Sequence, residues 1–132
     1  MSSRFKAAPF LGGSNIYCVN LRQYTAEGNF TSFQKHLPRL RDMGVQILWF
    51  MPIHPIGLKN RKGTLGSYYS IKDFEDVNPE YGNRPEFAAL VQEAHALGMK
   101  VILDWVANHT AWDNKWTGTN PEFFEKDAQG NF

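Results

Sequence analysis

Residues 83–110, NRPEFAALVQEAHALGMKVILDWVANHT, contain one complete helix-to-strand unit. Asn83, followed three residues later by Glu86, makes a capping-box pattern that is typical of a helix start. Apolar residues then recur at helical spacing: Phe87, Leu90, Val91, Ala94 and Leu97. Gly98 suits the left-handed position that ends a helix, and the apolar run 99–106 follows it at once. The stretch therefore predicts a helix that leads directly into a buried strand.

The same pattern occurs earlier, in TSFQKHLPRLRDMGVQILWFMP, residues 31–52. Thr31 and Gln34 repeat the capping-box spacing, and Gly44 separates the helical part from the apolar run that follows. Pro38 lies too deep for a straight helix, so we expect a kink or a late helix start. Helix, glycine and strand, repeated in this order, indicate an α/β fold with a parallel sheet.

Three further segments complete the predicted organisation. The pattern of residues 15–24, NIYCVNLRQY, indicates a first strand, so we expect three parallel strands and two main helices. The connection 52–82 is too long for a simple loop, and long loops usually carry function. The tail, residues 111–132, has turn residues and aromatics but no convincing period.

Composition narrows the class of protein. With 132 residues, 42% of them hydrophobic, the chain has the size and composition of one globular domain. A net charge of +1 from well-mixed charges gives no sign of a nucleic-acid groove or a basic membrane patch. No apolar run is long enough to span a membrane, and Cys18 has no partner for an internal disulfide. The N-terminus lacks a signal-peptide pattern, so we expect a cytoplasmic protein.

Polar residues at the ends of the predicted strands are the candidates for chemistry, because parallel β/α folds bind ligands beyond the carboxyl ends of their strands. Asp104 interrupts the apolar run of the last strand, and a buried carboxylate must be paired or hydrogen-bonded. One explanation is a salt bridge to an arginine, with Arg22 of the first strand as the candidate. The other explanation is that Asp104 braces a binding site.

Three more residues have two interpretations each. His109 either caps a loop or donates a hydrogen bond to a ligand hydroxyl, and we favour the ligand. Asn108 either holds the loop or offers one oxygen to a hard cation such as calcium. Tyr69 is either a core residue or an aromatic stacking platform.

Three motifs together resemble the α-amylase family of glycoside hydrolases. DWVANH, residues 104–109, resembles the family's D-x-x-x-N-H motif on the third strand of a (β/α)8 barrel. GSYYSIKDFEDVNPEYGN, residues 66–83, resembles the G-x-Y-x-x-x-D-[YF] stretch and the N-P-x-[YF]-G that follows it. Residues 16–30 and 44–57 resemble the family's first and second strands.

The resemblance implies a partial TIM (β/α)8 barrel over residues 1–110 and the start of the excursion called domain B over residues 111–132. It implies that Tyr69 stacks on the sugar in the central subsite and that His109 hydrogen-bonds the same sugar. Asp73 corresponds to a family aspartate near the site.

The resemblance also implies roles for Asp104 and Asn108. Asp104 corresponds to an aspartate that orients catalytic neighbours through an arginine. Asn108 corresponds to a residue that ligates calcium in many members and holds domain B in place in others. Calcium, bound through Asn108, is the only cofactor that the resemblance suggests.

The family's retaining chemistry needs a nucleophile and an acid/base about 5 Å apart. In the family these carboxylates follow the fourth and fifth strands, whereas typical barrels need about 250 residues, so we expect both to be absent from this chain. The resemblance implies a hydrolase that acts on α-glucans such as starch or maltooligosaccharides. The alternatives are a non-catalytic carbohydrate-binding module, which would use Tyr69, His109 and nearby tryptophans, and an inactive structural fragment.

The predicted sheet leaves backbone edges and an apolar face without partners. Three strands and two helices cannot close a barrel, and unpaired edge strands tend to associate. We therefore expect a homo-oligomer, most simply a dimer, in which self-association completes the sheet.

Overall fold

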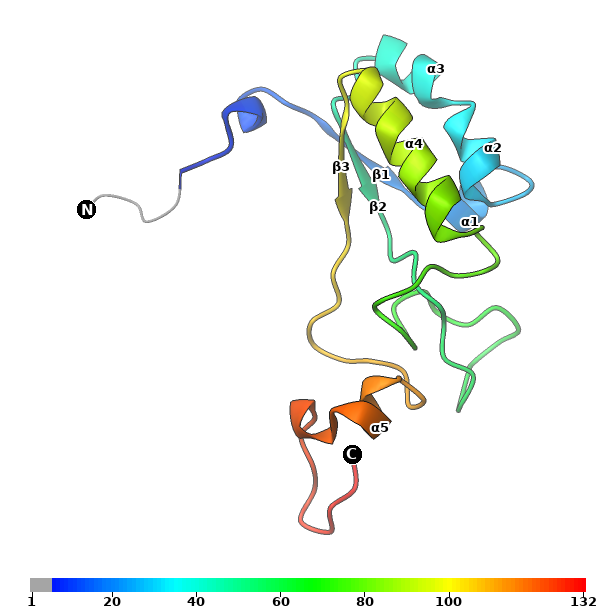
Figure 1. The fold of residues 1–132 in the computed structure, drawn as a ribbon, viewed down its shortest axis with the longest axis vertical. Coiled ribbons are helices and arrows are strands. Elements are labelled where there is room, and N and C mark those ends of the chain that lie inside the picture. Colours follow the sequence, from blue (N-terminus) through cyan, green and yellow to red (C-terminus); the bar gives the residue numbers. More distant parts are fainter. Residues whose placement is uncertain (1–5) are drawn as a thin grey trace.

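Three parallel strands form the sheet at the centre of the fold, in a computed structural model that describes residues 6–132 (Figure 1). The strands lie side by side in the order β1 (Ile16–Val19), β2 (Ile47–Phe50) and β3 (Lys100–Leu103). Both neighbouring pairs are parallel, and their register places Cys18, Trp49 and Ile102 in one row across the sheet. The predicted three-stranded parallel sheet is confirmed.

Helices cover one face of this sheet (Figure 1). They are α2 (Phe30–Gln34), α3 (Leu37–Asp42) and α4 (Arg84–Ala96). The side chains enclosed between helices and sheet are wholly buried and apolar: Phe33, Leu37, Leu40, Leu48, Phe50 and Leu90. Removal of this apolar surface from water is the main source of stability.

Helix α4 follows the prediction at both ends. The Asn83 side chain accepts a hydrogen bond from the Glu86 N–H at 3.0 Å, and the Glu86 carboxylate accepts one from the Asn83 N–H at 2.9 Å. Gly98 follows the helix with a φ of +78°, a left-handed conformation that glycine adopts at low cost. The predicted capping box and glycine stop are confirmed.

The first helical region is divided into α2 and α3. Pro38 lies in the first turn of α3, and α2 has already ended at Gln34, so the expected interruption is present. The predicted cap at Thr31 is wrong. Asn29 caps α2 instead, because its extended backbone lets its side chain accept a hydrogen bond from the Ser32 N–H at 2.9 Å.

The first and last strands are shorter than the sequence indicates. Strand β1 ends at Val19, and the chain then forms the short helix α1 (Leu21–Tyr24), so Arg22 is not on a strand. Strand β3 ends at Leu103, and Asp104 follows it immediately. The Asp104 N–H still donates to the Phe50 carbonyl at 2.9 Å, which extends the strand pairing by one residue.

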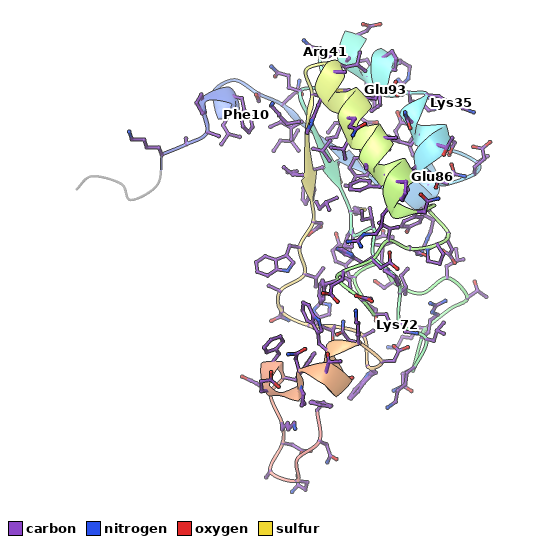
Figure 2. The ribbon with its side chains drawn as sticks, viewed as in Figure 1. Phe10, Lys35, Arg41, Lys72, Glu86 and Glu93 are labelled. Atoms are coloured by element: carbon purple, nitrogen blue, oxygen red, sulfur yellow. The ribbon has the colours of Figure 1, made fainter. Side chains whose placement is uncertain are left out.

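No helix of the described chain covers the second face of the sheet, which we call the bare face (Figure 1). Ile16, Trp49 and Ile102 point to it and are 56%, 37% and 43% exposed. The prediction of a buried last strand is therefore wrong, because Ile102 on the bare face and Leu103 on the side toward α4 are both partly exposed, at 43% and 40%. The 3-10 turn η1 (Pro9–Leu11) lies on an N-terminal segment that extends away from the helices, and Figure 2 places Phe10 there.

The long loop and the tail pack together beyond the carboxyl ends of the strands (Figure 1). Ile56 and Ile71 form an isolated antiparallel bridge inside the loop. The Ala111 N–H donates to the Ile71 carbonyl at 2.9 Å, which joins the tail to the loop. The tail then forms two short helical turns, α5 (Trp116–Thr119) and η2 (Pro121–Phe123), which the sequence did not predict.

Candidate functional site at the carboxyl ends of the strands

Tyr69 and Asp104 meet at the carboxyl end of the sheet. Side chains alternate along a strand, so Asp104 continues the row of Ile102 on the bare face. The Tyr69 hydroxyl donates a hydrogen bond to Asp104 Oδ2 at 3.0 Å. Partial burial, together with this hydrogen bond and the negative charge of Asp104, raises the pKa of Tyr69 to about 12. The phenol therefore stays protonated at neutral pH and orients the carboxylate.

Arg22 does not pair with Asp104, so that explanation of the carboxylate is wrong. Its guanidinium donates to the carbonyls of Gly66 and Leu65 at 3.1 and 3.3 Å and lies 3.9 Å from Glu80. It also lies over the Tyr68 ring, 5.4 Å from the centroid. Arg22 comes after the strand, on α1, and its side chain therefore braces the long loop.

Asn20 is a site residue that the sequence analysis missed. Its side-chain amide donates to the Tyr68 hydroxyl at 3.3 Å and to Gln23 at 3.1 Å. Asn20 follows β1 directly, so its position at the carboxyl end of a strand was the available signal. Tyr68 and Tyr69 therefore contact polar groups from two different strands.

His109 and Asn108 lie in a different part of the site. Both are exposed, and the Asn108 side-chain nitrogen lies 3.4 Å from His109 Nδ1. They line a hollow of about 170 Å³ with Trp105, Phe74 and Trp116, and Tyr69 is not among the residues that line it. The structure places His109 and Tyr69 on loops that meet at the same end of the sheet, in separate local surroundings.

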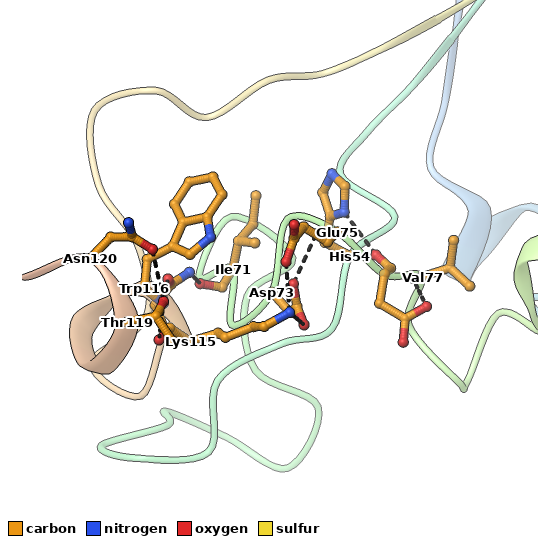
Figure 3. A network of polar contacts seen from close by, with 11 residues as sticks. His54, Ile71, Asp73, Glu75, Val77, Lys115, Trp116, Thr119 and Asn120 are labelled. Atoms are coloured by element: carbon orange, nitrogen blue, oxygen red, sulfur yellow. Dashed lines mark hydrogen bonds and ion pairs between the residues drawn. The ribbon is translucent and has the colours of Figure 1, made fainter. Parts of the chain in front are cut away.

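Asp73 belongs to a third group, a network of polar contacts that also includes Glu75 and Lys115 (Figure 3). The Lys115 ammonium lies 3.7 Å from Asp73 and donates a hydrogen bond to Glu75 at 2.6 Å. Asp73 also lines a broad hollow of about 780 Å³, together with Arg84 at the start of α4. The structure therefore does not bring Asp73 together with Tyr69 or His109.

Lys115 joins the long loop to the tail, and the sequence analysis did not identify it. The hydrogen bond to Glu75, followed by the negative charges of Asp73 and Glu75, raises the pKa of Lys115. Beside it, buried Asn114 donates to the Ile71 carbonyl at 2.9 Å, and Trp116 stacks on Phe74 with ring centroids 5.0 Å apart. The burial of the Asn114 amide is visible only in the folded structure, so no pattern in the sequence indicated its role.

The predicted calcium ligand has little support from its surroundings. Calcium takes six to eight oxygen ligands, mostly from carboxylates and carbonyls. Within residues 6–132, no group of three or more His, Cys, Asp or Glu side chains has an arrangement suited to a metal. Asn108 supplies one amide oxygen, so the residues described do not by themselves form a calcium site.

Comparison with known proteins identifies the family. The model of the alpha amylase catalytic domain matches residues 10–129, and the chain therefore belongs to the α-amylase family. It is 51% identical to an alpha-amylase from Lactobacillus plantarum, with a TM-score of 0.87 over 89% of this chain and 28% of that one. An alpha-amylase from Geobacillus thermoleovorans complexed with acarbose has 28% identity and a TM-score of 0.68, over 86% of this chain and 28% of that one. The fold is thus part of a (β/α)8 barrel, as predicted.

Curated relatives have several activities. The chain is 39% identical to an alpha-1,4-glucan:maltose-1-phosphate maltosyltransferase of Cereibacter sphaeroides, over 74% of this chain and 19% of that protein. It is 37% identical to the alpha-amylase SusG of Bacteroides thetaiotaomicron, over 67% of this chain and 12% of that protein. The chain therefore spans less than a fifth of the length of these relatives.

In the described part, none of the helices has the length and apolar character that crossing a membrane requires.

Proposed function

We propose that this chain supplies the sugar-binding part of an α-amylase-family site and that its ligand is an α-glucan. The observation that carries this proposal is the hydrogen bond between Tyr69 and Asp104 at the carboxyl ends of the strands. It fixes an aromatic side chain at the edge where β/α folds bind ligands. Acarbose, which occupies the related Geobacillus thermoleovorans structure, is consistent with a ligand of this class.

The roles of the individual residues follow from their positions. Tyr69 provides a ring for stacking, and Asp104 holds that ring through its hydroxyl. His109 is exposed, so its ring is free to hydrogen-bond a sugar hydroxyl. Asp73 acts through the loop, since it contacts Lys115 and lies apart from both residues. Asn108 positions the segment that carries His109, and calcium binding there stays a prediction.

We further propose that the 132 residues bind α-glucan without hydrolysing it efficiently. The nucleophile and acid/base of a retaining glycosidase must flank the scissile bond about 5 Å apart. Asp104 is the carboxylate that contacts Tyr69, and Lys115 engages Asp73 and Glu75 elsewhere. Among the residues that the structure describes, the site therefore offers binding groups without a second carboxylate paired with Asp104.

The test is calorimetric titration of the chain with maltose, alongside reducing-sugar release from soluble starch. Tyr69→Ala should weaken binding by roughly tenfold or more, because aromatic contact and its fixed geometry are both lost. Tyr69→Phe keeps the ring and should have a smaller effect. Starch hydrolysis that His109→Ala and Asp104→Asn abolish would favour a complete enzyme, and absence of sugar binding would favour an inactive structural fragment.

We also propose that the isolated chain forms a homodimer through the bare face. Ile16, Trp49 and Ile102 are exposed apolar side chains on that face, and within residues 6–132 β1 and β3 each pair with β2 alone. A second copy presents an identical apolar surface, so a two-fold arrangement buries both at once. Light scattering of the purified chain measures its mass directly, and a monomer at micromolar concentration would contradict the proposal.

A further inference from the structure

Trp112 lines a hollow beside the loop that carries Tyr69. Its volume is about 250 Å³, and its polar lining includes the hydroxyl side chains of Ser67, Ser70 and Thr110. Trp112 forms part of the wall and is 57% exposed. Single exposed apolar side chains are common on protein surfaces, so the exposure of Trp112 alone does not indicate a binding site. The contacts that hold the residues on either side of Trp112 are the further evidence.

The residue before Trp112 is fixed in position. Ala111 is buried, and its N–H donates to the Ile71 carbonyl at 2.9 Å. Gly57 packs directly against it, since a Cβ added to Gly57 would lie 2.3 Å from the Ala111 Cβ. This close approach leaves no room for a larger residue and ties the tail to the long loop.

The residue after Trp112 is fixed as well. The Asp113 carboxylate accepts the Leu58 N–H at 3.0 Å and lies 3.7 Å from the Lys72 ammonium. Burial alone would raise the pKa of Asp113, but the backbone N–H groups and Lys72 together lower it. With both neighbours anchored, the backbone that carries the indole is held in place, which lowers the cost of ordering the protein when a ligand stacks on Trp112.

The wall of the hollow combines neutral hydrogen-bonding groups with cations, since Lys59, Arg61 and Lys62 all line it. Arg61 is the most enclosed cation of its wall, yet its guanidinium donates to the carbonyls of Gly57, Ile56 and Thr64 at 2.7, 2.9 and 3.2 Å. The Arg61 guanidinium is therefore engaged by the carbonyls of its own loop. Besides the exposed side chains of Lys59 and Lys62, the hollow offers an aromatic surface and hydroxyl groups, the combination that holds a polyhydroxylated ring.

The hollow shares both of its loops with the candidate sugar site. Ser67 and Ser70 stand on either side of Tyr69 in the chain, and Thr110 follows His109 directly. We infer that Trp112 forms a second sugar-binding subsite for an α-glucan chain that extends from the Tyr69 site. The inference rests on the proposed function and narrows its ligand to oligosaccharides longer than a disaccharide.

Calorimetric titration with maltose and maltoheptaose tests this inference on the intact chain. Trp112→Ala should raise the Kd for maltoheptaose by roughly three- to tenfold, the range expected for one aromatic contact, and leave maltose binding unchanged. Trp112→Phe should retain most of the affinity because it keeps a stacking surface. Met43→Ala is the matched control, since Met43 is 60% exposed at the end of α3 and should change neither value. Circular dichroism verifies that each variant is folded.

The outcomes separate this inference from the proposed function. Unchanged maltoheptaose binding in Trp112→Ala, or equal weakening for both sugars, overturns the second subsite. If Tyr69→Ala abolishes maltose binding in that same case, the proposed function stands alone. Length-dependent loss in Trp112→Ala with no effect of Tyr69→Ala supports the subsite and counts against the proposed function. Failure of the wild-type chain to bind either sugar overturns both.

Discussion

Both faces of the sheet carry apolar side chains, but most of those on the helix face are at least partly buried and most of those on the bare face are exposed. Leu48 and Phe50 point toward the helices and are 0% exposed, whereas Trp49 between them is 37% exposed on the bare face. Ile102 in the neighbouring strand is 43% exposed on the same side. The hydrophobic side chains alone therefore do not distinguish the two faces of the sheet. The packing of α2, α3 and α4 shows which face the chain buries.

The largest effect is expected from truncation on the helix face. Phe50→Ala should lower the free energy of unfolding by about 3–5 kcal/mol, because it removes a fully buried ring and leaves a cavity. Urea denaturation followed by circular dichroism measures this loss. Trp49→Ala at low protein concentration is the matched control and should cost far less. Equal losses for the two variants would break the distinction between the faces.

A charge on the bare face should weaken self-association. Trp49→Glu would place a carboxylate where a second copy is proposed to pack, and should raise the dimer dissociation constant by more than roughly tenfold. Light scattering over a dilution series gives this constant. Met43→Glu, on the helix side, should leave it unchanged. A dimer that persists unaltered in Trp49→Glu would assign the interface to another surface.

The smallest effect concerns Tyr69, at the carboxyl end of the bare face. Its pKa of about 12 in the folded chain exceeds the ordinary value of 10.0, so the folded state keeps a proton that the unfolded state loses. The stability of the wild-type chain should therefore fall between pH 10 and pH 12, and below pH 10 this contribution is constant. Tyr69→Phe should lack this component of the decline.

Absorbance titration of tyrosinate measures the same group directly. The difference between wild type and Tyr69→Phe should appear above pH 10.0, within the range in which circular dichroism shows a folded chain. A difference that appears fully at pH 10 would mean that the Tyr69 hydroxyl is neither desolvated nor bonded to Asp104.

Much of the fold followed from local sequence patterns. Asn83, Glu86 and Gly98 define both ends of α4, because caps depend on groups within a few residues of each other. The same locality explains the missed cap at Asn29, since two polar residues only two positions apart, Asn29 and Thr31, were both suited to the cap and backbone conformation decided between them. The motif around Tyr69 and His109 likewise indicated the family, which the comparison confirmed.

Side-chain partners across the chain were not predictable in this way. By sequence alone, Asp104 had Arg22 as a plausible partner, yet the fold gave it Tyr69, 35 residues away, and turned Arg22 toward the loop carbonyls. Lys115 and Asn114 gained their roles only when the tail packed against the long loop.

The sequence by itself determined both ends of α4, the order of the main helices and strands along the chain and the polar residues near the strand ends, because each depends on spacing along the chain. The tertiary structure alone decided which face of the sheet is covered and which of those polar residues meet. Both outcomes depend on contacts between distant segments, whose formation no local pattern encodes.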